Sequence, residues 1–206
     1  ADALAIKAYL FSLKPVRSET PANTLSFPYN QRWLMTIWSA MFNPNRRFEP
    51  NTAQTAQWNR GAYLVEGLAH CGECHTPRNL LQATDNRRKF SGAVTSGWRA
   101  YNITADKTAG IGAWSDDEIA QFLSTGHALG RGVAGGPMGE AVDLSFRFLT
   151  AGDIKAIVTY LKTVPAQATP GLPAPKTTPA PAAPKEGVVA DMNPMGKHIF
   201  EGACAS

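Results

Sequence analysis

The amino-acid sequence predicts an all-α fold. Several stretches carry apolar residues at helical spacing, and each ends where a proline or glycine interrupts the pattern. Ser115 and Glu118 stand three residues apart just before one such stretch, in the arrangement of a helix capping box. Helical stretches of similar sequence also recur along the 206 residues, so we expect repeated helical units.

Two helices are expected before the middle of the chain, separated by an extended, turn-rich segment. Residues 2–13 carry one apolar face and end at Pro15. Residues 31–42 end before Pro44 and are apolar nearly all round: Trp33, Leu34, Met35, Ile37, Trp38, Met41 and Phe42. A helix that is apolar on every side is usually buried. We therefore expect this one to pack between two units of the chain or against a partner protein.

The next expected helix covers residues 58–76 and runs into a stretch with two cysteines. Gly61 in this helix has no side chain, so the last helix of the unit, around Tyr160 and Leu161, can approach its backbone closely. Residues 77–114 contain glycines among polar residues and are expected to form loops.

The remaining elements complete one unit. Residues 115–125 form the capped helix, which ends at Gly126. Residues 130–139 are expected to form a glycine-rich loop, and the final helix opens at residues 150–153. Residues 165–187 are rich in proline, alanine and threonine, which indicates an extended, semi-rigid linker.

The stretch Cys71-Gly72-Glu73-Cys74-His75 is a C-x-x-C-H motif, which is typical of covalent attachment of c-type haem. Two thiols at this spacing can each form a thioether to one vinyl group of the same haem. His75 then lies beneath the iron as its proximal ligand. A zinc site would need two further ligands at ordered spacing, and none follows in this stretch. A thioredoxin-like cysteine pair would need a βαβ context, whereas the flanks here look helical.

Met138 is the candidate for the sixth iron ligand. It follows the capped helix and precedes the last one, the place from which class I cytochromes c supply a methionine. Glycines and Pro137 around it would let the loop fold against a haem edge. His127 is the rival, because bis-His ligation is chemically sound, but it directly follows the helix-ending Gly126. The other candidates fit less well: His70 directly precedes Cys71, and Met35 and Met41 belong to the apolar helix.

Two internal echoes indicate that the chain is a piece of a longer protein. Residues 2–13 resemble 153–164, and residues 61–67 resemble 196–202. In the second pair, residues 61–67 precede Cys71 and residues 196–202 precede Cys204. Cys204 then begins a haem motif that is cut short, although a free thiol on a frayed tail is the alternative. We expect five segments. Residues 1–14 are the last helix of a preceding unit, residues 15–55 a connector with the apolar helix, and residues 56–165 one complete haem unit. Residues 166–190 are a Pro/Ala-rich linker, and residues 191–206 are the start of a third, truncated unit.

The composition argues against three classes of protein: nucleic-acid-binding, disulfide-rich and membrane-spanning. The formal net charge is only +4, and the basic residues are scattered apart from Arg87-Arg88-Lys89, so nucleic acid is not an expected partner. Three cysteines do not make a disulfide framework when two are committed to haem. No apolar run approaches the roughly 20 residues that span a bilayer.

The chain resembles the tri-haem cytochrome c subunits of bacterial membrane-bound dehydrogenases, and in particular their middle haem domain. The resemblance covers most of the sequence, including residues 61–79, 102–106, 108–115, 136–142 and 160–165, residues 23–28 and the helix with Trp33 and Trp38. It implies a class I cytochrome c-like domain, one complete unit flanked by partial units. It also implies haem c held by Cys71 and Cys74, with iron ligated by His75 and Met138, in one complete site and a further site truncated at Cys204.

The resemblance also implies partners and a location. Such subunits serve quinoprotein alcohol dehydrogenases and flavin-dependent gluconate, sorbitol and aldehyde dehydrogenases, and pass electrons towards ubiquinone or a terminal oxidase. We therefore expect a periplasmic electron-transfer subunit at the outer face of the cytoplasmic membrane, with membrane association through parts absent from this sequence.

An iron with two protein ligands has no open position for substrate, so we do not expect catalysis by this chain itself. The alternative is a haem enzyme with an open iron position, of the di-haem peroxidase type, or a sensor of small ligands.

Overall fold

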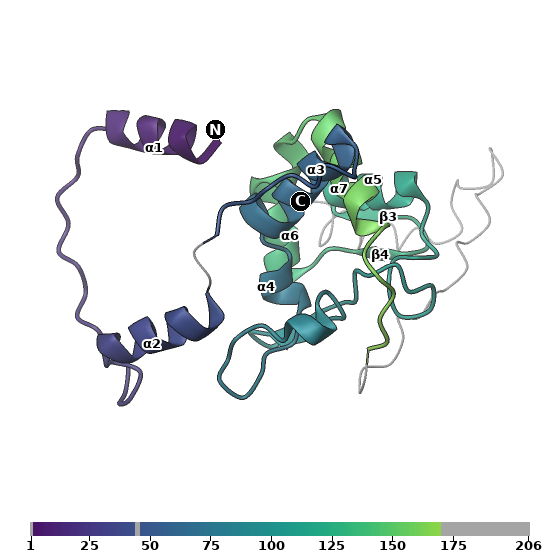
Figure 1. Cartoon of the computed structure of the whole chain (residues 1–206). Helices are drawn as coiled ribbons and strands as arrows, with labels where there is room; N and C mark the ends of the chain where they lie inside the picture. Colours follow the sequence, from purple (N-terminus) through teal and green to yellow (C-terminus); the bar gives the residue numbers. More distant parts are fainter. Residues whose placement is uncertain (1, 44–45, 170–206) are drawn as a thin grey trace, which may run out of the picture. The chain divides into compact units, whose positions relative to one another are not determined.

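The computed structural model describes residues 2–43 and 46–169. The chain divides into two compact units, Ala1–Asn45 and Arg46–Ser206 (Figure 1). Helices dominate the described residues and the strands are only two or three residues long, which confirms a mostly helical fold. The class I cytochrome c architecture and the division into five segments stay predictions. Most of the expected linker and the expected third unit around Cys204 lie outside the described residues.

The first unit contains the two expected helices, α1 (Asp2–Ser12) and α2 (Arg32–Phe42). None of the residues in either helix is buried, and the Trp33 side chain is 62% exposed. The expectation that α2 is apolar on all sides needs correction. Its polar residues Arg32, Thr36 and Ser39 are spaced four and three residues apart, so they share one side of the helix. The helix is therefore amphipathic.

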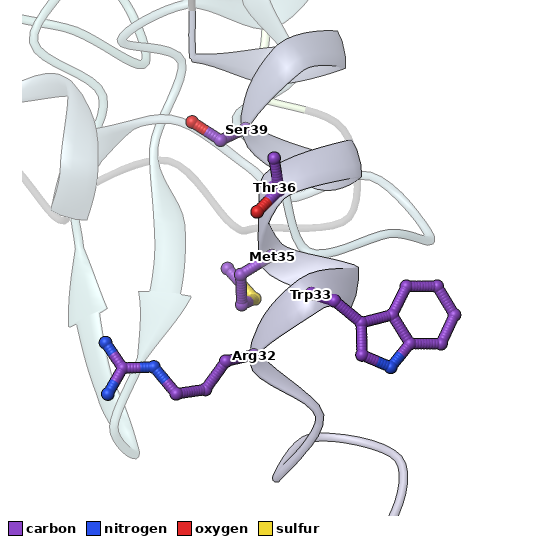
Figure 2. A pocket seen from close by; sticks show the side chains of 5 residues that line it. All are labelled: Arg32, Trp33, Met35, Thr36 and Ser39. Atoms are coloured by element: carbon purple, nitrogen blue, oxygen red, sulfur yellow. The ribbon is translucent and has the colours of Figure 1, made fainter.

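A pocket lies on α2 and is lined only by residues of that helix (Figure 2): Arg32, Trp33, Met35, Thr36 and Ser39. Arg32 and Met35 project to one side of the helix in this view, and Trp33 projects to the other. None of the candidate haem residues lines this pocket. Among the residues that the structure describes, no helix has both the length and the apolar character needed to cross a membrane.

The second unit begins with α3 (Ala56–Tyr63), capped by the Thr55 side chain, which accepts from the backbone N–H of Trp58. The single helix expected over 58–76 is instead broken. A π-turn follows at Leu64–Leu68, and His70 then adopts a left-handed backbone with φ 36°. The short helix α4 (Gly72–His75) starts only after this kink. The widened turn lets the Cys71 N–H reach the carbonyl of Val65, so the cysteine pair leaves the axis of α3.

The region expected to consist of loops contains a short 3₁₀ turn at Asn86–Arg88 and a hairpin, β1 (Ala93–Thr95) with β2 (Trp98–Ala100). Both loop residues of the hairpin have positive φ, 51° at Ser96 and 79° at Gly97. That pattern is typical of the tight turns whose twist matches paired strands.

The second half of the unit holds two long helices, α5 (Asp116–Thr125) and α7 (Ala151–Leu161). The capping box of Ser115 and Glu118 and the left-handed Gly126 at the end of α5 are both as expected. A second small hairpin, β3 (His127–Ala128) with β4 (Gly132–Val133), follows α5. A 3₁₀ turn at Phe146–Phe148 precedes α7.

The glycine-rich loop is shorter than the expected 130–139, because α6 (Gly136–Leu144) begins inside it. Pro137 lies in the first turn of α6, where a missing backbone N–H costs nothing, since the first N–H groups of a helix have no partner within it. Met138 therefore lies on the first turn of a helix, and its expected place in a loop is corrected.

Helices α3 and α7 pack against each other (Figure 1). The core of the unit is built from aliphatic and aromatic side chains of α5, α6 and α7 and of the turns and loops between the helices. Its members are Leu64, Val65, Phe90, Ile111, Ile119, Leu123, Val142, Phe146, Ile154, Ile157, Val158, Leu161 and Val164. Arg60 on α3 and Asp153 on α7 add a two-pronged ion pair, with Nε to Oδ1 at 2.7 Å and Nη2 to Oδ2 at 3.2 Å.

Candidate haem-binding site

The two candidate attachment cysteines lie about one helical turn apart around α4. Cys71 is half-buried and packs against the core, whereas Cys74 is exposed, and both thiols are free. The His75 N–H donates to the Cys71 carbonyl at 3.0 Å, which closes the turn. Burial raises the pKa of the Cys71 thiol to about 12, so it is protonated at neutral pH. Residues three apart in a helical turn share a side, so the pair can meet one flat ligand.

His75 is held at two points. Its ring Nδ1 lies 2.6 Å from the backbone carbonyl oxygen of Tyr101, and its own carbonyl accepts from the Gly92 N–H at 2.8 Å. Burial lowers the pKa of His75, so the ring is neutral and carries a single proton. A carbonyl accepts only, so that proton lies on Nδ1 and the lone pair is left on Nε2. This is the tautomer that metal-ligating histidines use.

Met138 is half-buried and packs against the same core as Cys71. The hairpin β1–β2 connects the two candidate ligand segments. Tyr101, directly after β2, accepts from His75, and Thr95 Oγ1 donates to the Cys74 carbonyl at 3.5 Å. Trp98, the partner of Thr95 across the hairpin, lies so close to Gly136 that a Cβ there would come within 2.4 Å of the indole. The structure thus links both segments through one hairpin, and ligation by Met138 stays a prediction.

The rival ligands occupy different settings. His127 is exposed in β3, where its partner across the hairpin is Val133. His70 occupies the left-handed kink directly before Cys71. Met35 and Met41 are exposed on α2, in the other unit.

Haem fits the residues that are present. The Cys71, Cys74 and His75 donors have the chemistry that c-type haem requires, and the neutral His75 ring offers Nε2. Large apolar side chains also stand exposed on the segments next to α4 and on the two hairpins: Leu80, Leu81, Val94, Trp98, Leu129 and Val133. An apolar macrocycle would bury surface of this kind. Within residues 2–43 and 46–169, no group of three or more His, Cys, Asp or Glu side chains could hold a bare metal ion.

Sequence reasoning missed a polar network next to Cys71. The Glu66 carboxylate accepts hydrogen bonds from the Tyr160 hydroxyl and the Lys89 ammonium group. Burial, followed by the bond to Glu66, raises the pKa of the Tyr160 hydroxyl. The internal sequence repeats contained a signal for this network, because the repeated segments align Tyr160 with Tyr9 and Glu66 with Glu201. The Tyr101 carbonyl had no such signal, since any residue can supply a backbone acceptor.

Comparison with known proteins identifies the relatives of this chain, although no protein-family model matches it. A nicotinate dehydrogenase subunit of Pseudomonas putida is 40% identical over 205 residues, which cover 99% of this chain and 16% of that protein. The fructose dehydrogenase cytochrome subunit of Gluconobacter japonicus is 43% identical over 172 residues, covering 82% of this chain and 35% of that subunit. The gluconate 2-dehydrogenase cytochrome c subunit of Pantoea cypripedii is 35% identical over 176 residues, covering 81% and 40%.

The chain spans less than half the length of each of these three relatives. Two of them are named as cytochrome subunits of dehydrogenases, in agreement with the expectation of a cytochrome subunit in place of a catalytic one. The chain is thus a homologue of the cytochrome c subunits of bacterial dehydrogenases, as its haem motif and the residues around it predict.

Proposed function

We propose that this chain binds haem c covalently through Cys71 and Cys74, with His75 and Met138 as the axial ligands, and transfers electrons. The observation that carries the proposal is the 2.6 Å contact between His75 Nδ1 and the Tyr101 carbonyl, directly after a cysteine pair on a single helical turn. Haem c supplies a one-electron redox centre when bound. The homology to dehydrogenase cytochrome subunits supports the same role.

The chain's own residues each have a task in this proposal. The thiols of Cys71 and Cys74 fix the haem in place, and the Tyr101 carbonyl holds the His75 ring with Nε2 available. The Met138 thioether, on the first turn of α6, would supply a second ligand to the iron. With two ligands from the protein, the iron would have no coordination site left for a substrate, which favours electron transfer over catalysis.

We further propose that electrons come from a quinoprotein or flavoprotein dehydrogenase subunit and leave towards ubiquinone or a terminal oxidase. The names of the relatives support the first partner, because they are subunits of fructose and gluconate dehydrogenases. The periplasm, at the outer face of the cytoplasmic membrane, is the proposed location. The location is proposed because covalent attachment of haem to reduced thiols takes place there.

The test is expression of the 206-residue chain in a bacterium with a c-type haem maturation system, followed by acid–acetone extraction. We expect the haem to stay with the protein, and to be lost to the solvent in a Cys71→Ser/Cys74→Ser double variant. Haem that partitions wholly into the solvent from the unmodified chain would overturn covalent attachment. A carbon monoxide difference spectrum then separates the functions: no shift is expected for a six-coordinate iron, and a strong shift would indicate the open iron position of a haem enzyme.

A further inference from the structure

The first residues after α7 do not leave the domain directly. The Val164 carbonyl accepts from the Ala105 N–H at 3.1 Å, and the Gln167 N–H donates to the Thr104 hydroxyl at 3.2 Å. The chain therefore runs alongside residues 102–105 before the described part ends at residue 169. The beginning of the proline-rich segment is thus packed as part of the domain.

Asn102 is the main attachment point for this segment. It is 3% exposed, and its side-chain amide makes four hydrogen bonds. Oδ1 accepts from the N–H and the hydroxyl of Thr104, at 2.8 and 2.7 Å. Nδ2 donates to the Gln167 carbonyl at 2.7 Å and to the Thr169 hydroxyl at 2.8 Å. A backbone N–H on one side and a backbone carbonyl on the other fix which atom is which.

Thr169 connects two backbone segments, each of which forms a hydrogen bond with His75. Its hydroxyl accepts from Asn102 and donates to the Ser91 carbonyl at 2.8 Å. Asn102 directly follows Tyr101, whose carbonyl binds the His75 ring. Ser91 directly precedes Gly92, whose N–H binds the His75 carbonyl. One hydroxyl from the segment after α7 therefore joins the segment that holds the His75 ring to the segment that holds its backbone.

These two segments are themselves closely packed. The Ile103 N–H donates to the Phe90 carbonyl at 2.9 Å. Gly92 has φ 91°, and a Cβ there would come within 3.0 Å of the Asn102 nitrogen. Such packing transmits small displacements, because protein interiors are dense and have little free space.

We propose that Asn102 and Thr169 are positioning residues, which set the hydrogen bond between the Tyr101 carbonyl and His75 and thereby tune the reduction potential of the haem. The inference rests on the proposed haem attachment at Cys71, Cys74 and His75. A firm hydrogen bond from Nδ1 makes a ligating imidazole more basic, which favours the oxidised iron. Loosening the bond removes that effect, so the potential rises. The segment that continues towards the rest of the chain is by this route coupled to the iron.

The test compares three variants of the haem-loaded 206-residue chain. Thr169→Val replaces only the hydroxyl by a methyl group, and Thr169→Ser keeps the hydroxyl. Thr163→Val is the matched control, because this exposed hydroxyl accepts from the Trp58 indole and contacts neither Ser91 nor Asn102. We expect a higher reduction potential in Thr169→Val, and unchanged potentials in Thr169→Ser and Thr163→Val. Amide hydrogen exchange at Gly92 should be faster in Thr169→Val alone.

Equal potentials and equal Gly92 exchange in Thr169→Val and the unmodified chain would overturn the inference. An equal shift in Thr163→Val would also overturn it, because the effect would then be general loosening. Failure of haem attachment in the unmodified chain is a separate result, which overturns the proposed function before any potential is measured.

Discussion

A side chain at Gly61 would collide with the backbone of Ala156: a Cβ built on Gly61 lies only 1.9 Å from the Ala156 carbonyl oxygen. The same Cβ would be 2.9 Å from the Cβ of Tyr160. Helices α3 and α7 therefore touch backbone to backbone at this point. The sequence predicted the close approach to the last helix near Tyr160, because only glycine permits it.

Gly61→Ala should destabilise the second unit strongly, since the obstacle is backbone that cannot rotate away. We expect a loss of at least about 1–3 kcal/mol, the usual cost of an added methylene in a packed core. Gly152→Ala is the matched control, because its Cβ would meet its nearest neighbour at an ordinary 3.8 Å. That change should be neutral or stabilise by up to about 1 kcal/mol. Urea unfolding followed by tryptophan fluorescence or circular dichroism measures both, and equal stabilities would contradict the crossing.

Met138→Ala should abolish the weak far-red charge-transfer band of the oxidised haem protein and lower its reduction potential. Both effects follow from loss of a thioether ligand. His127→Ala should leave the band in place, because His127 is exposed on β3 and is not the proposed ligand. If the band survives in Met138→Ala and vanishes in His127→Ala, the ligand assignment is wrong.

Arg131 ties the hairpin β3–β4 to the start of α5, ahead of Met138. Its guanidinium donates to both oxygens of Glu118, each at 3.0 Å, and to the Ala113 carbonyl at 2.8 Å. Arg131→Gln should cost about 1 kcal/mol of stability, the typical net value for such bonds. Arg131 also holds the pKa of Glu118 below its ordinary value, so an NMR titration should show that pKa rising in the variant. Arg147→Gln, which alters an exposed arginine over Phe148, should change neither quantity.

Asp85 should make the stability of the second unit depend on pH in the acid range. The side-chain hydrogen bond from Arg87 is the largest cause that lowers the pKa of Asp85 to about 2. A carboxyl with a depressed folded-state pKa stabilises the fold above its ordinary pKa, about 3.9, and loses that contribution as the pH falls towards about 2.

The difference in unfolding free energy between the unmodified chain and Asp85→Asn should therefore be constant above about pH 4 and shrink at lower pH. Urea unfolding at a series of pH values measures it. When both proteins also carry Arg87→Gln, the difference in unfolding free energy should disappear at a higher pH. The reason is that the Arg87 hydrogen bond, the largest cause of the lowered Asp85 pKa, is then absent. A difference that stays constant down to about pH 2 would contradict the assignment.

The sequence predicted local structure best at positions where the residue type indicates only one conformation or contact. Ser115 with Glu118 predicted a helix start, Gly126 its end, and Gly61 a close helix contact, and the structure has all three. Predictions from mixed signals failed in part. Pro137 suggested a loop, yet the same residue is favourable in the first turn of a helix, and α6 begins there. The Ser96-Gly97 pair is a hairpin signal that the interpretation of residues 77–114 as loops overlooked.

In the candidate site, too, the sequence predicts some features and gives no signal for others. The side chains of the motif, Cys71, Cys74 and His75, can be proposed from their spacing alone. The left-handed kink at His70 has no such signal, because no glycine marks its position in the way that Gly126 marks the end of α5. The bond from His75 to Tyr101 crosses 26 residues and ends on a backbone oxygen, so nothing in the side chains predicts it.

The packing of α3 against α7 also affects the order in which parts of the second unit fold during synthesis. Arg60 and Asp153, which join the two helices, are 93 residues apart in the sequence. Closing a loop of that length costs roughly 4 kcal/mol plus a constant in chain entropy. Cys71, His75 and Met138 all lie inside this loop, so a nascent chain released before residue 150 lacks the helix that closes it. We therefore expect the candidate haem-binding site to be among the last parts of this unit to become rigid during synthesis, which leaves the motif cysteines accessible until late in folding.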